Sequence, residues 1–115
     1  MIESWVAIRC HYADLASRDP RLAPMRDLVE QIEASPALSR LYAWTSMGDL
    51  HIVQTPVSYP YDGPKLVIAP TGDGSVEFRY LDTPIESKQW RRVAPGPAAF
   101  SRLQEFTEQL HWFAR

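Results

Sequence analysis

The stretch LYAWTSMGDLHIVQT, residues 41 to 55, predicts a β-hairpin around which the rest of the chain is organised. Both arms are rich in β-branched and aromatic residues, which suit a half-buried pleated surface. Gly48 and Asp49 between the arms fit the two-residue loop of a type II′ turn, which takes glycine first. We expect this hairpin to be the centre of the core and also a platform for binding.

A second hairpin is predicted from KLVIA at residues 65 to 69 and SVEFRYL at residues 75 to 81. The intervening PTGDG contains glycines that can supply left-handed turn conformations. In the second arm apolar and charged residues alternate, which assigns one face to the core and one to water. Residues 82 to 96 are ambiguous, because Trp90 and Val93 fit either a fifth strand or a short helical turn between prolines.

Three segments have helical periodicity. Residues 4 to 17 place an apolar stripe at steps of three and four behind a Ser4 N-cap, although an edge strand is the alternative for their first part. A second helix is expected from Pro24 through residue 34, followed by a short helical turn that begins at Ser35 and Pro36. The third helix, residues 97 to 113, is amphipathic. The stripes consist of Trp5, Ile8, Tyr12 and Leu15, of Met25, Leu28, Val29 and Ile32, and of Phe100, Leu103, Phe106, Leu110 and Phe113.

This order of elements predicts an α+β fold. An antiparallel sheet of four to five strands, formed by two hairpins, should carry two N-terminal helices and one C-terminal amphipathic helix. With 115 residues, the chain is expected to form a single domain over residues 1 to 115.

Composition narrows the functional classes. No apolar run is long enough to span a membrane, and the N-terminus lacks the pattern of a secretion signal. A single cysteine excludes an internal disulfide and indicates a reducing, cytoplasmic setting. A net charge of -2 argues against nucleic-acid binding, because a general nucleic-acid binder is markedly basic.

No catalytic, metal or cofactor motif is complete. Cys10 and His11 are neighbours on a helix and point about 100° apart, so we expect a small buried cysteine and a surface histidine rather than a nucleophile and its base. The three histidines lack metal-ligand spacing, and His51 is expected on a half-exposed strand face. The sequence TGDGS at residues 71 to 75 is followed by a β-rich run, which favours a hairpin turn over a phosphate loop. We therefore expect no catalytic residue, no cofactor and no metal. These absences favour a non-enzymatic function without deciding it.

The candidate binding residues are aromatic and basic. The stretch TPVSYPYDGP, residues 55 to 64, is a proline-stiffened loop whose tyrosines either serve recognition or fold back onto the sheet. The cluster KQWRR, residues 88 to 92, fits an acidic protein surface better than DNA, and its tryptophan is expected to pack inward. If Tyr42 and Trp44 of the first hairpin and Trp90 lie on the same side as this loop, the aromatic residues would form one patch. The predicted partner-binding residues are Tyr42, Trp44, Tyr59, Tyr61, Trp90 and Arg91.

These features predict a small non-catalytic protein-interaction module. In size and layout the chain is similar to small bacterial α+β interaction modules, including immunity and antitoxin proteins. The partner is expected to be another protein or a second copy, as in a homodimer. The alternative is a small-molecule-binding domain or minor enzyme, with an aromatic-lined pocket between the sheet and the C-terminal helix. In that pocket His51, Tyr61 and Arg79 would supply polar contacts.

Overall fold

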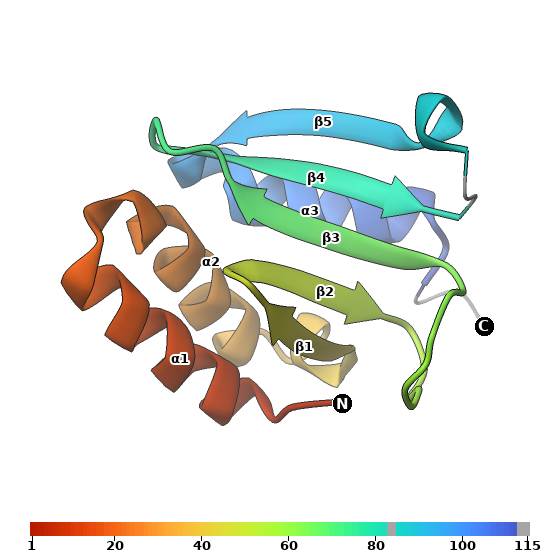
Figure 1. Cartoon of the computed structure of the whole chain (residues 1–115), viewed down its shortest axis with the longest axis horizontal. Coiled ribbons are helices and arrows are strands. Elements are labelled where there is room, and N and C mark those ends of the chain that lie inside the picture. The colour runs from red at the N-terminus through yellow and green to blue at the C-terminus, as the bar shows by residue number, and fades with distance from the viewer. Residues whose placement is uncertain (83–84, 113–115) are drawn as a thin grey trace.

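The computed structural model describes residues 1–82 and 85–112, and it confirms the α+β class. A five-stranded antiparallel sheet has the sequential strand order β1-β2-β3-β4-β5, and three helices pack on it (Figure 1). The helices are α1 (Trp5–Arg18), α2 (Ala23–Ala34) and α3 (Ala99–Gln109). The strands are β1 (Tyr42–Ser46), β2 (Asp49–Val53), β3 (Lys65–Pro70), β4 (Ser75–Leu81) and β5 (Trp90–Pro95).

All three helices contact the same face of the sheet. The strand residues of the main core occupy alternate positions on that face, and they form one cluster with buried residues of each helix. The strand members are Ala43, Leu50, Ile52, Leu66, Ile68, Val76, Phe78 and Ala94, and the helical members include Ile8, Tyr12, Met25, Leu28, Val29, Ile32, Leu103 and Phe106. The sheet therefore has a helix face and an open face.

Helix α1 begins as its sequence predicts. The Ser4 hydroxyl accepts a hydrogen bond from the Ala7 amide, and Ile8 and Tyr12 are fully buried. This confirms the helix and excludes the edge strand for this segment. The expectation that Cys10 is buried is wrong, because Cys10 is exposed. It lies two residues from Ile8, about 200° around the helix axis, and therefore outside the buried stripe.

The other helical predictions are confirmed with small shifts. The predicted stripe of α2 is buried, and Pro24 lies in its first turn. The Ser35 hydroxyl accepts a hydrogen bond from the Leu38 amide and so closes the turn that leads into the short 3₁₀ turn Leu38–Arg40, whose N-cap is Ala37 rather than the predicted Ser35. Helix α3 is preceded by a 3₁₀ turn, Gly96–Ala98. Phe113, the last residue of the predicted helix, lies outside the described residues.

The first hairpin is confirmed, but its turn is displaced by one residue. Ser46 pairs with Asp49, so the two-residue loop consists of Met47 and Gly48 rather than Gly48 and Asp49. Both loop residues have positive φ, 53° and 87°, which is the signature of a type I′ turn. The predicted type II′ turn is therefore wrong. The type I′ turn places Asp49 in β2, where a residue with negative φ is needed.

Residues 82 to 96 contain both elements that the sequence allowed. A 3₁₀ turn, Glu86–Lys88, is followed by β5, which pairs with β4 along its length. Both Trp90 and Val93 lie in that fifth strand. The predicted turn at residues 71 to 75 is also confirmed, since β4 follows it directly.

Candidate functional site

The open face carries most of the predicted binding residues, although Trp44 among them is buried, at 9% exposure. A single row of directly paired residues crosses all five strands on this face, from Trp44 in β1 to Arg91 in β5. Tyr42, Val53, Lys65, Glu77 and Val93 lie on the same face by the two-residue period of the strands. The crossing row consists of Trp44, His51, Val67, Arg79 and Arg91.

The loop between β2 and β3 treats its two tyrosines differently. Tyr59 is 84% exposed, and its peptide bond to Pro60 is cis. The Tyr61 ring instead folds back, and its hydroxyl donates to the Pro64 carbonyl at 2.7 Å. A Cβ at Gly63 would lie 2.7 Å from the Tyr61 hydroxyl oxygen, so the chain needs glycine there for this close packing. Each of the two alternatives for this loop therefore holds for one tyrosine. Tyr59 is available for recognition, and Tyr61 folds back and braces the loop.

A hollow of about 340 Å³ separates this loop from the hairpin. The Trp44 ring stacks on His51, with centroids 5.2 Å apart, and meets the Tyr61 ring edge-on at 6.3 Å. The Lys65 ammonium lies 5.8 Å from the centroid of the Trp44 ring. The lining residues from loop and strands include Trp44, His51, Tyr59, Tyr61, Asp62 and Lys65.

His51 is held neutral on this face. Burial, with the nearby charges of Lys65 and Arg79, lowers the pKa of His51 to about 4. Within the described residues, its Nδ1 atom is buried and has no hydrogen-bond partner. At neutral pH the His51 ring therefore behaves as an aromatic surface and a hydrogen-bonding group, not as a cation.

The β4 and β5 part of the open face is basic. Glu77 is the shared partner of two arginines: its carboxylate lies 3.3 Å from Arg79 Nε and 3.6 Å from Arg91 Nε. The Arg91 side chain is 53% exposed, whereas those of Glu77 and Arg79 are about half as exposed. One carboxylate thus faces two guanidinium groups. Asp49 in β2 lies on the same face and also interacts electrostatically with Arg79, so a second carboxylate offsets part of this positive charge.

Trp90 lies on the other side of the sheet from these residues. Because Arg91 belongs to the open-face row, its neighbour Trp90 faces the helices, where its ring packs edge-on against Phe106 with centroids 4.3 Å apart. Tyr42 and Trp44 do share the open face. An aromatic patch that also includes Trp90 is therefore not formed, and the prediction that Trp90 packs inward is confirmed.

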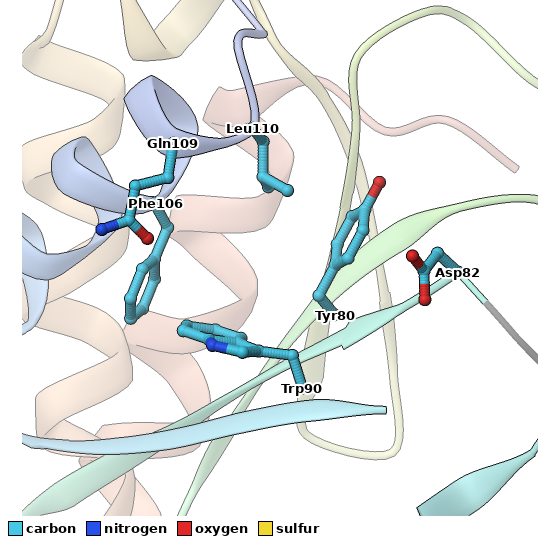
Figure 2. Close-up of a pocket in the computed structure, with 6 residues that line it drawn as sticks. All are labelled: Tyr80, Asp82, Trp90, Phe106, Gln109 and Leu110. Carbon is cyan, nitrogen blue, oxygen red and sulfur yellow. The ribbon is translucent and has the colours of Figure 1, made fainter. Parts of the chain in front are cut away.

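A cavity between the sheet and the C-terminal helix is present, as the alternative function requires. It has a volume of about 290 Å³, and we call it the α3 cavity. The prediction that His51, Tyr61 and Arg79 supply its polar contacts is wrong, since His51 and Arg79 face the opposite side of the sheet and Tyr61 packs there. Its lining residues are Tyr80, Asp82, Trp90, Phe106, Gln109 and Leu110 (Figure 2).

Features of catalysis are sparse over the described part of the chain. Residues 1–82 and 85–112 contain no group of three His, Cys, Asp or Glu side chains suited to a metal ion. In the same ranges Cys10 is free and exposed. No helix among them is long and apolar enough to cross a membrane.

Comparisons with protein-family models, curated proteins and solved structures found no match to this chain.

Proposed function

We propose that this protein is a non-catalytic protein-binding module, comparable to small regulatory, immunity or antitoxin-like proteins, and that it binds through the open face and Tyr59. The supporting observation is the one-sided arrangement of the fold, because all three helices pack on the other face. Tyr59 and Val93 are exposed toward opposite edges of the open face, at 84% and 58%. Exposed aromatic and apolar side chains around a rigid sheet suit protein recognition.

The chemistry of the open face favours a partner with an acidic surface. The cations of this face, Lys65, Arg79 and Arg91, outnumber the carboxylates of Glu77 and Asp49 by one charge, and Arg91 is the more exposed of the two arginines. Arginine beside aromatic residues is typical of the residues that dominate binding energy at interfaces. A carboxylate of the partner near Arg91 would form a charge-assisted hydrogen bond. A reducing compartment such as the cytoplasm is the proposed setting, supported by the single cysteine.

A second copy of the chain is the less well supported partner. The free edge of β1 is bridged by Glu3, whose amide donates to the Ala43 carbonyl at 2.9 Å. In a register centred on Arg91 or Arg92, antiparallel pairing of two β5 strands would place the same arginine of both copies opposite each other, and like charges at such positions are destabilising. Light scattering of the purified chain distinguishes a monomer from a dimer.

The test is capture of partners from the native cell with the wild-type chain and with Tyr59→Ala. We expect a specific protein with the wild type and at least a several-fold lower yield with Tyr59→Ala, because exposed aromatic anchors carry much of the binding energy. Val6→Ala on the outer side of α1 is the control, since Val6 is also exposed, at 53%. Equal recovery with both variants, or no specific protein with the wild type, would contradict the proposal.

A second function, binding of a small molecule, is supported by the α3 cavity. Its volume of about 290 Å³ is near the lower end of the range for ligand pockets, roughly 300–1,000 Å³. It combines aromatic walls with a few polar groups at its rim, as ligand sites generally do. This function is independent of the first, because the two surfaces lie on opposite sides of the sheet.

A further inference from the structure

We propose that the α3 cavity binds a methylated ammonium group, of the kind found in choline or in a methylated lysine side chain. This inference deepens the second function proposed above and rests on it. It identifies the chemical class of the ligand, which the presence of a cavity alone does not.

The walls of the α3 cavity are aromatic rings set at steep angles to one another. Tyr80 and Trp90 are directly paired across β4 and β5, and both face α3. The Phe106 ring stands nearly perpendicular to Trp90, at 85°. Figure 2 shows the Phe106 and Tyr80 rings on either side of Trp90, with Leu110 closing the space above it. Rings arranged around a small space offer their electron-rich faces to a cation, as in the aromatic cages that bind methylated ammonium groups.

The charges around the α3 cavity favour a positive ligand. Asp82 is its only charged lining residue in the described part of the chain, and Gln109 adds a neutral polar group. Burial, followed by the charge of Asp82, raises the pKa of Tyr80, so its hydroxyl remains neutral at physiological pH. A carboxylate at the rim compensates the charge of a bound cation, while the rings replace the water that a methylated ammonium holds weakly.

Trp90 already binds a cation within the folded chain. The guanidinium carbon of Arg92 lies 5.0 Å from the centroid of the Trp90 ring. Arg92 is exposed and does not line the α3 cavity, so solvent weakens its repulsion of a cationic ligand. The contact shows that the Trp90 ring makes a cation–π interaction in this fold, with a cation that lies outside the α3 cavity.

The size of the α3 cavity limits the ligand. About 290 Å³ is enough for a compact, branched head group. A methylated ammonium fills such a space with methyl groups in contact with the rings and has no N–H that needs a buried acceptor. An unmethylated ammonium would lose hydration without equivalent hydrogen bonds.

The experiment is a titration of the full chain, followed by amide NMR, with choline and with its neutral carbon isostere, dimethylbutanol. We expect choline to shift the Trp90 indole and Gln109 side-chain amide signals and to bind between about three and about thirty times more tightly than the isostere. Equal affinities would overturn the inference and leave the second proposed function standing. No shift with either compound would overturn both.

Two further ligands separate the sources of the methylated group. Tighter binding of trimethyllysine than of choline indicates that the ligand is a modified protein segment, and tighter binding of choline indicates a small metabolite. Either result supports a methylated ammonium ligand. Unmodified lysine that binds as tightly as trimethyllysine would contradict it.

Variants locate the binding to the α3 cavity. Asp82→Asn is expected to lower choline affinity about two- to fivefold and to leave dimethylbutanol unchanged, because it removes only a partly screened charge. Asp62→Asn on the far side is the matched control and should change neither. Tyr80→Leu should weaken choline about threefold or more, whereas Tyr42→Leu on the open face should not. If Tyr80→Leu fails to fold, Asp82→Asn still tests the site, because Asp82 is exposed. An unchanged ratio of choline to dimethylbutanol affinity in Asp82→Asn would contradict the role of this carboxylate.

Discussion

Met47 occupies a backbone conformation that its side chain does not favour. Its φ is 53°, in the left-handed region, and its side chain is completely exposed and makes no packing contribution. A type I′ turn favours Asn followed by Gly, and Gly48 is already in place. We therefore expect Met47→Asn to raise the free energy of unfolding by about 1 kcal/mol, measured by urea denaturation. Met47→Ala keeps the unfavourable φ, so a similar gain in that variant would contradict the explanation.

His51 on the open face makes the free energy of unfolding depend on pH. Because its pKa in the folded protein is lowered to about 4, the unfolded chain binds more protons between that pH and about 6.5. Its contribution to stability is thus complete above about pH 6.5 and is lost as the pH falls toward 4. Unfolding measured across this window should show a falling free energy for the wild type and a flatter profile for His51→Gln. A wild-type slope in His51→Gln would refute the assignment.

At the level of elements, one hydrogen bond ties α1 to the first hairpin. The buried Tyr12 hydroxyl donates to the Gly48 carbonyl at 2.9 Å, and Tyr12 is buried completely. Tyr12→Phe leaves that carbonyl without its partner and should cost about 1 kcal/mol in chemical denaturation. Tyr42→Phe, at an exposed strand position, is the control and should cost less than about 0.5 kcal/mol. Equal effects would show that the contact does not stabilise the fold.

The end of α3 is a Schellman motif without glycine. The Trp112 amide donates to the Thr107 carbonyl and the His111 amide to the Glu108 carbonyl, with His111 at φ 57°. This turn directs Trp112 back toward the sheet, where its ring lies 6.4 Å from Tyr80.

The same substitution should therefore have opposite effects at two histidines. His111→Gly is expected to stabilise the protein by about 1 kcal/mol, since glycine adopts positive φ without penalty. His11→Gly, inside α1, should destabilise it by a few tenths of a kcal/mol. Thermal unfolding of both variants measures the pair, and a change of the same sign in both would contradict the cap assignment.

Most elements could be predicted from their sequence periods. The stripe of α2 and the alternation of β4 depend only on local spacing, and both are confirmed. The first turn was displaced because Gly48 suits either position of a two-residue loop, and only the pairing of Ser46 with Asp49 decides between them. The burial of Trp112 has no local signal in the sequence, because Trp112 lies outside the predicted apolar stripe and is buried only through the left-handed turn at His111.

For the whole molecule, the arrangement of layers is what local patterns could not supply. Periodicity shows that Trp90 and Arg91 have opposite faces, but not which of them meets α3. The strand register assigns Trp90 to the helices and Arg91 to the open face. The sequence therefore predicts the α3 cavity in its observed place, between the sheet and the C-terminal helix. The polar residues predicted for it lie on the open face instead, and they are His51, Tyr61 and Arg79.

The central claim is that the open face binds a partner, and two arginines form a matched pair to test it. Arg91 on the open face and Arg102 on α3 are each 53% exposed, and they lie 3.6 Å and 3.7 Å from a glutamate carboxylate. The decisive measurement is the affinity of the captured partner for Arg91→Ala and Arg102→Ala by titration calorimetry. The account predicts a loss of about tenfold or more for Arg91→Ala and less than about twofold for Arg102→Ala. Equal losses, or a larger loss for Arg102→Ala, would contradict it.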